Sequence, residues 1–132
     1  MTVFMDTSAF LAVLDADDAN HERASQIWRE LITQEETLAC SNYVLVETFA
    51  LVQNRLGMTA VRVLQNDILP MISVEWVDES LHRSGVSALI TAGRRHLSLV
   101  DCTSFETMRR LGTQRAFTFD QHFAEQGFDC LP

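Results

Sequence analysis

The sequence contains no lysine, and all ten of its Lys-or-Arg positions are arginine. A phosphate-binding loop of the Walker A type and a Schiff-base mechanism both need a lysine, so the sequence excludes both. Acidic residues number 18, which leaves a formal net charge of −8. This charge argues against nucleic-acid binding through bulk attraction to phosphate, although it is compatible with a local arginine patch.

Glycine, proline and cysteine are also scarce, with five, two and three copies in 132 residues. Collagen-like and Pro/Gly-rich chains are thereby excluded, and the 47% hydrophobic content favours a packed core over disorder. The cysteines lack CxxC spacing, so we expect buried free thiols rather than a disulfide framework or a zinc ribbon.

Long hydrophobic runs are absent as well. The most apolar stretch, Tyr43 to Val52, is interrupted by Glu47 and is far shorter than the about 20 residues that a membrane span needs. The first residues lack the basic segment of a secretory signal. We therefore expect a single domain over residues 1–132 that works in the cytoplasm without membrane contact.

Short apolar runs alternate with amphipathic or capped segments along the whole chain. The runs predict strands at residues 2–5, 37–40, 71–77, 115–119 and 128–131. The segments between them predict helices at residues 7–14, 21–34, 42–56, 59–69, 78–92 and 101–111, with a short one after residue 120. This alternation predicts an α/β fold in which helices cover both faces of a parallel sheet. Ligands bind such sheets outside the carboxyl ends of the strands.

Glu47 is an acid in an apolar setting. Its neighbours one helical turn away are Tyr43, Val44, Ala50 and Leu51. This pattern predicts a carboxylate on the apolar face of a largely buried helix, where an unpaired charge is costly. The charge must be neutralised by a shifted pKa, by an arginine or by a metal, and the residues alone leave these alternatives open.

Asp101 and Asp120 each follow an apolar run and precede a predicted helix. The ordinary role of an aspartate in that position is to cap the helix N-terminus. For Asp101, the segment Thr103–Glu106 offers a rival capping box, which would free its carboxylate for another task. Capping remains the alternative to a ligand role for both residues.

Asp6 ends the first predicted strand, where Thr7 or Ser8 can cap the next helix, so a ligand explains this aspartate better. Acids on four separate elements can converge in the fold. Converging carboxylates raise one another's pKa, and a hard divalent cation removes that conflict. Oxygen ligands favour Mg²⁺ or Mn²⁺ over zinc, and such ions serve phosphate-ester hydrolysis by activating water. The four histidines lack metal-ligand spacing, so we expect them at the surface or in hydrogen bonds.

Four segments of the chain resemble the motifs of PIN-domain nucleases, in the family's order and over nearly the whole length. They are Asp6–Leu11, Ser41–Glu47, Leu97–Phe105 and Ala116–Phe123. The resemblance implies an α/β/α sandwich around a parallel sheet, together with Mg²⁺- or Mn²⁺-dependent ribonuclease activity. Small members of this length are mostly VapC-type toxins, so the resemblance also implies a cognate antitoxin and a homodimer.

Carried over residue by residue, the resemblance implies an acidic metal site of Asp6, Glu47, Asp101 and Asp120. Asp6 and Asp101 would bind the metal directly. Glu47 would complete the ligand set or orient water, and Asp120 would support a second metal or act through water. The reaction would be hydrolysis of an RNA phosphodiester by metal-activated water, without a covalent enzyme intermediate.

Two further sets of residues are candidates for supporting roles. Thr7 and Thr118 would hydrogen-bond the carboxylates or a water on the metal. RNA contact would fall to Arg94, Arg95, Arg109 and Arg110. Such arginine pairs more often belong to a solvated face, which is the alternative. For the whole protein, the alternative is a PIN-like module that binds RNA or protein without cutting.

Overall fold

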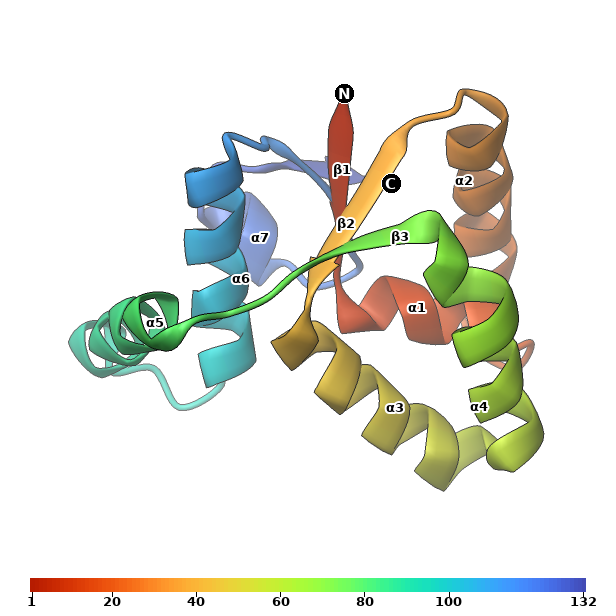
Figure 1. Ribbon diagram of the computed structural model, residues 1–132, viewed down its shortest axis with the longest axis horizontal. Coiled ribbons are helices and arrows are strands. Elements are labelled where there is room, and N and C mark those ends of the chain that lie inside the picture. The colour runs from red at the N-terminus through yellow and green to blue at the C-terminus, as the bar shows by residue number, and fades with distance from the viewer.

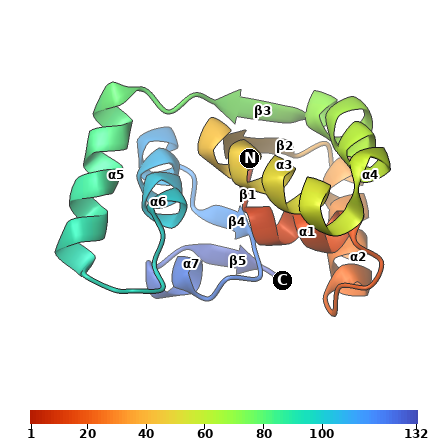
Figure 2. The same ribbon diagram turned by 90° about the horizontal axis from the view of Figure 1, so that it is seen from below.

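The computed structural model describes residues 1–132, and a five-stranded parallel sheet forms its centre (Figures 1 and 2). The strands are β1 (Thr2–Met5), β2 (Thr37–Ser41), β3 (Ile72–Glu75), β4 (Arg115–Phe117) and β5 (Asp129–Leu131). Their order is β3-β2-β1-β4-β5, and every neighbouring pair is parallel. The chain therefore builds outward from β1 in both directions. The carboxyl end of β1, beside that of β4, is the place where such a sheet binds ligands.

Seven α-helices connect and cover the strands. They are α1 (Thr7–Leu14), α2 (His21–Thr33), α3 (Asn42–Leu56), α4 (Met58–Val63), α5 (Glu79–Ala92), α6 (Leu99–Leu111) and α7 (His122–Glu125). In Figure 1, α6 and α7 lie on one side of the strands and α1, α2 and α4 on the other. α5 packs on α6 and projects from the body in both views. The predicted α/β class with a parallel sheet is confirmed. None of the helices combines the length and the apolar composition that a membrane crossing requires.

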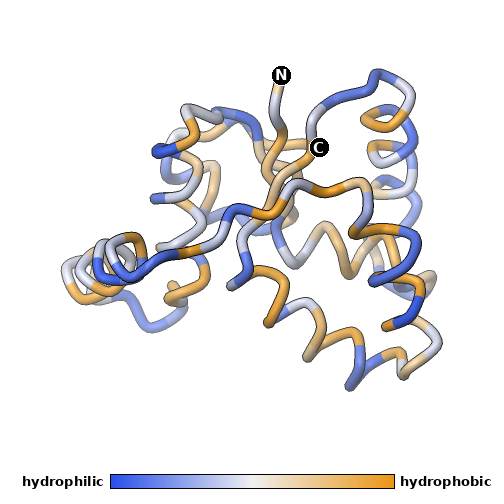
Figure 3. The backbone as a smooth tube through the Cα atoms, viewed as in Figure 1, coloured by the Kyte–Doolittle hydropathy of each residue, from blue (hydrophilic) through white to orange (hydrophobic).

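The core explains why the first strand is an uninterrupted apolar run. Val3, Phe4 and Met5 are all fully buried, because helices cover both faces of the central strand. Phe117 on the neighbouring strand and Phe123 on α7 are fully buried as well. Figure 3 shows hydrophobic residues along the central strands and a further long hydrophobic stretch on α3.

That stretch on α3 is not buried as the sequence suggested. Val44, Thr48 and Val52 are fully buried, but Val46 is 70% exposed and Ala50 is also exposed. The prediction of a largely buried helix is therefore wrong. One face of α3 packs into the molecule, and a second apolar face meets solvent.

The start of α6 also differs from the prediction. Ser98, not Asp101, caps this helix: its Oγ accepts a hydrogen bond from Asp101 N at 3.0 Å. The Asp101 carboxylate returns the bond by accepting from Ser98 N at 3.1 Å, which completes a capping box. The helix therefore begins at Leu99 and includes part of the apolar run before Asp101, and the rival box at Thr103–Glu106 is not formed.

Smaller corrections concern element ends. Asp6, and neither Thr7 nor Ser8, caps α1. The strand predicted at 71–77 covers only Ile72–Glu75, and the one predicted at 115–119 ends at Phe117. The helix predicted at 59–69 is α4, followed by a π-helical turn at Leu64–Ile68 and a 3₁₀ turn at Leu69–Met71.

Candidate active site

Asp6 lies at the carboxyl end of β1 and is only 5% exposed. Its Oδ2 accepts three hydrogen bonds, from Ser8 Oγ at 2.8 Å, Thr118 Oγ1 at 3.1 Å and Ser8 N at 3.4 Å. Its Oδ1 accepts none from the protein. The carboxylate is thus held rigidly by one oxygen, and the other is available to a ligand.

Ser8 and Thr118 extend this network to the segment after β4. The Ser8 hydroxyl also accepts from Phe119 N at 2.9 Å, and the Thr118 hydroxyl accepts from Asp120 N at 3.0 Å. Thr118 therefore bonds both the Asp6 carboxylate and the backbone of Asp120, so it sets the spacing between the two acids. The sequence singled out Ser8 only as a possible cap. An aspartate followed two residues later by serine was the available signal for the contact it makes.

Asp101, Asp120 and His122 form a cluster in which one ligand atom of each lies within 4.8 Å of the others. Asp120 Oδ1 accepts from the backbone N of His122 at 2.9 Å. The ring Nδ1 of His122 is also 2.9 Å from this oxygen, but out of line for a hydrogen bond, and 3.9 Å from Asp101 Oδ2. Nδ1 is enclosed and has no hydrogen-bond partner. The sequence did not predict His122 here, and its position two residues after Asp120 was the only hint.

Glu47 is half-buried on α3 and belongs to the same group of charges. Burial raises the pKa of its carboxyl, and the negative charges of Asp101 and Asp120 raise it further. The neighbouring Thr7 hydroxyl lowers this pKa. Thr7 also ties α1 to α3, because it donates to Val44 O at 3.3 Å.

Burial and neighbouring negative charges also raise the pKa values of Asp6 and Asp101. Burial raises the pKa of Asp6 to about 6, and the charges of Asp101 and Asp120 contribute while the Ser8 hydrogen bonds oppose the shift. The pKa of Asp101 is raised by burial and by Asp120, against the bond from Ser98. The charges of the four predicted acids therefore act on one another, while only Asp101 and Asp120 belong to the cluster whose ligand atoms lie within 4.8 Å.

No arginine neutralises this group. The arginine ion pairs of the protein involve Glu36, Glu79, Glu106, Glu125 and Asp78, and none of the four acids of the site. Of the three ways in which Glu47 was expected to lose its charge, an arginine is excluded. Protonation or a cation remains, and the free oxygen of Asp6 favours a cation.

Three of the four arginines proposed for RNA contact form ion pairs with acids outside the site. Arg94 pairs with Glu125 at 2.9 Å, Arg109 with Glu106 at 3.2 Å and Arg110 with Asp78 at 3.5 Å. Arg95 is exposed and forms no ion pair. Pairing to acids is the arrangement expected of a solvated face, although surface pairs of this kind open readily.

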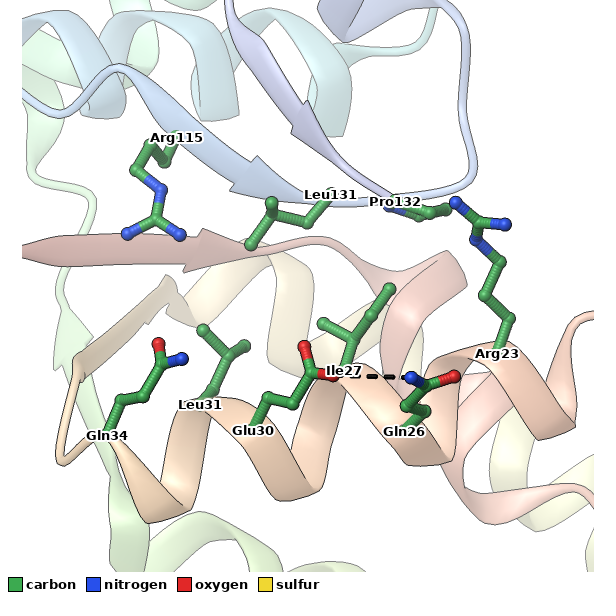
Figure 4. Close-up of a pocket in the computed structure, with 9 residues that line it drawn as sticks. All are labelled: Arg23, Gln26, Ile27, Glu30, Leu31, Gln34, Arg115, Leu131 and Pro132. Atoms are coloured by element: carbon green, nitrogen blue, oxygen red, sulfur yellow. Dashed lines mark hydrogen bonds between the residues drawn. The ribbon is translucent and has the colours of Figure 1, made fainter.

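A separate hollow of about 420 Å³ lies between α2 and the end of β5 (Figure 4). Ile27 and Leu31 of α2 face Leu131 across it, and Arg23 and Arg115 also line it. None of the four acids contributes, so this hollow is distinct from the acidic site.

The chain matches the PIN domain family over residues 3–129. It is 35% identical over 127 residues to the 23S rRNA-specific endonuclease VapC20 of Mycobacterium tuberculosis, covering 96% of this chain and 95% of the relative. The chain belongs to the PIN-domain family, and the resemblance to its VapC-type members is confirmed.

Three solved structures share the fold of this chain. The crystal structure of M. tuberculosis VapC20, a sarcin–ricin loop cleaving toxin, matches with a TM-score of 0.81 at 32% identity, over 96% of this chain and 95% of that one. FitAcB from Neisseria gonorrhoeae has a TM-score of 0.74 at 18% identity, over 100% and 97% of the two chains. VapBC2 from Rickettsia felis, bound to a promoter DNA fragment, has a TM-score of 0.73 at 12% identity, over 98% and 97%. The last two show the shared fold alone.

Proposed function

We propose that this protein is a metal-dependent endoribonuclease that cuts ribosomal RNA and acts as the toxin of a toxin–antitoxin pair. One observation carries the catalytic part: four acids from separate elements interact through their charges, two of them lie within ligand distance of each other, and none pairs with an arginine. The substrate follows from the relative. VapC20 is a 23S rRNA-specific endonuclease and matches nearly the whole chain, so we extend its substrate class to this protein.

The donor set suits a hard divalent ion. Asp6 offers Oδ1, and Asp101 lies close enough to raise the pKa of Asp6 by its charge. We assign these two carboxylates as direct ligands of Mg²⁺ or Mn²⁺, with Glu47 and Asp120 completing the site. When bound, such an ion supplies a Lewis acid for the phosphoryl group and lowers the pKa of water.

The chain's own residues then have separate tasks. Ser8 and Thr118 hold Asp6 in one orientation, so that its free oxygen points to a constant position. Glu47 is half-buried and its pKa is raised, so it is a stronger base than an ordinary glutamate and is suited to orient the attacking water and accept its proton. His122 holds the Asp120 carboxylate through its backbone N–H.

The test is cleavage of a 23S rRNA fragment that contains the sarcin–ricin loop, with Mg²⁺, with Mn²⁺ and with EDTA. We expect metal-dependent cuts that disappear in Asp101→Asn. Asp129→Asn is the matched control, because Asp129 is exposed and starts β5 at the opposite edge of the sheet. A folded wild-type protein that binds this RNA but never cuts it, under any of these conditions, would favour the non-cleaving module.

The toxin role has its own test. Expression of the protein alone should arrest growth, and co-expression of its cognate antitoxin should restore it. The Asp101→Asn variant, expressed to the same level, should not arrest growth. Robust growth during strong expression of folded wild-type protein contradicts the toxin role and leaves the nuclease proposal standing.

A homodimer through the side of α3 that faces β3 and Trp76 is part of the same proposal. An apolar groove of about 670 Å³ lies there, and the eight residues that line it carry no charge: Asn42, Leu45, Val46, Phe49, Gln65, Leu69, Val74 and Trp76. Trp76 is 73% exposed, which is unusual for so large a ring. In a protein of net charge −8, an uncharged face is where two copies repel least. Sedimentation equilibrium should give a dimer for wild type and a monomer for Trp76→Glu, and a monomeric wild type contradicts this part.

A further inference from the structure

A small apolar hollow of about 330 Å³ opens directly beside the acidic site, between α3 and the start of α6. Its walls are the side chains of Tyr43, Val46, Glu47, Ala50 and Val100. Glu47 belongs to the coupled acids, and Val100 immediately precedes Asp101. The hollow is therefore continuous with the place where the phosphodiester would be cut, and the hydrolysis itself gives it no task.

Tyr43 is the one aromatic wall of this hollow, and it is fixed in place. Its hydroxyl makes a 2.5 Å hydrogen bond with Nδ1 of His82 on α5. The two rings also meet edge to face, with centroids 5.8 Å apart and planes at 69°. Because the far end of the tyrosine is anchored in this way, its ring presents a rigid surface to the hollow, and ordering it on binding costs little entropy.

The chemistry of the walls selects among the parts of an RNA chain. A phosphate would approach the negative charge of Glu47 without an arginine to compensate it, so the hollow disfavours the backbone. A base is flat and uncharged, and it can stack on an aromatic ring. If the phosphodiester lies at the acids, the neighbouring base is one nucleotide away, which places it over the hollow. Loop RNA supplies unpaired bases that can be splayed out in this manner.

We propose that this hollow binds one unpaired base next to the cleaved phosphodiester, with Tyr43 as its stacking partner and His82 as the residue that holds Tyr43 in position. The inference rests on the proposed nuclease function and adds a specificity site to it. It also separates two tasks on α3, because Glu47 serves the chemistry and Tyr43, one turn earlier, recognises the substrate.

The test compares Tyr43→Ala and Tyr43→Phe on an RNA hairpin that contains the sarcin–ricin loop, with Mn²⁺. We expect Tyr43→Ala to raise KM about tenfold or more, as for loss of one stacked base, with a much smaller change in kcat. Tyr43→Phe keeps the ring and should restore KM to near the wild-type value. Ile90→Ala is the matched control, because Ile90 is 74% exposed on α5, the helix that carries His82.

Two further measurements separate stacking from other effects. In the Asp101→Asn background, which should leave the hairpin uncut, Tyr43→Ala should weaken hairpin binding without changing the salt dependence, because no phosphate contact is lost. A hairpin with an abasic nucleotide beside the cut should bind Asp101→Asn more weakly, by the same factor as the Tyr43→Ala change. The abasic hairpin and the intact hairpin should bind the double variant Asp101→Asn/Tyr43→Ala equally.

Three results overturn the proposal. If wild type cuts the hairpin and folded Tyr43→Ala has the same KM, the base site is refuted and the nuclease function still stands. A loss of dimerisation in Tyr43→Ala, with KM unchanged at concentrations where the dimer persists, shows that a second copy occupies the hollow. A wild-type protein that neither cuts nor binds the hairpin refutes the proposed function, and the base site with it.

Discussion

Replacing Gly85 by alanine should destabilise the protein, although alanine is the better helix former. Gly85 is buried on α5, at the crossing with α6. A Cβ at this position would overlap Cγ2 of Thr103 and would lie 3.4 Å from Thr103 Cα. The methyl group cannot simply turn away, because the Thr103 hydroxyl donates to Leu99 O at 2.9 Å and to Val100 O at 3.0 Å. Rotation would leave this buried hydroxyl unpaired, so the two helices must move apart instead.

The magnitude follows from two opposing effects. Glycine-to-alanine replacement in a helix gains about 1 kcal/mol from propensity. Overpacking of a closely packed site costs about 1–3 kcal/mol, and here no flexible neighbour can absorb it. We expect a net loss of up to about 2 kcal/mol in the free energy of unfolding, measured by urea denaturation with circular dichroism. Ser84→Ala, exposed on the same helix, is the control for propensity alone, and it should be neutral or slightly stabilising.

The double variant shows whether the overlap is the cause. Thr103→Ser removes Cγ2 and keeps the hydroxyl with its two hydrogen bonds. In that background Gly85→Ala should cost nothing, or stabilise by up to about 1 kcal/mol, so the two changes should be strongly coupled. If Gly85→Ala stabilises the otherwise wild-type protein, this result contradicts the close contact between Gly85 on α5 and Thr103 on α6.

The remaining predictions concern the site and its supports. Because burial raises the pKa of Asp6 to about 6, its protonated form is favoured in the folded protein, and the stability it contributes is present below pH 4 and lost as the pH rises through about 6. In EDTA at pH 8, Asp6→Asn should therefore be more stable than wild type by up to about 3 kcal/mol, and thermal unfolding from pH 4 to 8 should show the difference growing with pH. Added Mn²⁺ should stabilise wild type but not Asp6→Asn. An Asp6→Asn variant that is less stable than wild type at pH 8 in EDTA contradicts the burial of this charge. Thr118→Val keeps the shape but removes the hydroxyl that joins Asp6 to Asp120, so Mn²⁺ affinity by calorimetry should fall about 10–100-fold, whereas Thr113→Val, at another buried threonine, should leave it unchanged. Thr48→Val removes bonds from Thr48 Oγ1 to Val44 O at 2.7 Å and to Thr7 at 3.1 Å, and should cost about 1–2 kcal/mol of unfolding free energy without altering Mn²⁺ affinity.

The central strands were predictable because they are buried on both faces. Thr2–Met5 and Thr37–Ser41 are short apolar runs whose hydrophobic content has no helical alternative at that length. The prediction that α3 is largely buried was wrong, because the sequence does not distinguish an apolar side chain in the core from one on an exposed face. Only the tertiary arrangement distinguishes Val44, which is fully buried, from Val46, which is 70% exposed.

The candidate acids could be singled out for a different reason. Glu47 stands among apolar neighbours, and the other three acids each follow an apolar run in a segment that resembles a PIN-domain motif. The residues that hold these acids in place could not be predicted from the sequence. Ser8 and Thr118 are 110 residues apart, and their common bond to Asp6 exists only after β1 and β4 pair. His122 joins the cluster because a turn after Asp120 folds its ring back. The capping box of Ser98 was readable, because serine followed three residues later by an acid is its signature.

The net charge of −8 bears directly on how such a protein holds RNA. Three of the candidate RNA-contacting arginines are paired with acids, and four of the negative charges converge on the site itself. Bulk attraction to phosphate is therefore weak, and binding without a divalent cation is opposed at the point of cleavage. In the proposed nuclease, affinity would come from an ion held by the acids and from uncharged contacts to bases, which do not depend on the sign of the surface charge. The proposed base site at Tyr43 would supply such a contact, so recognition would rest on an unpaired base and on the metal rather than on the length of the RNA.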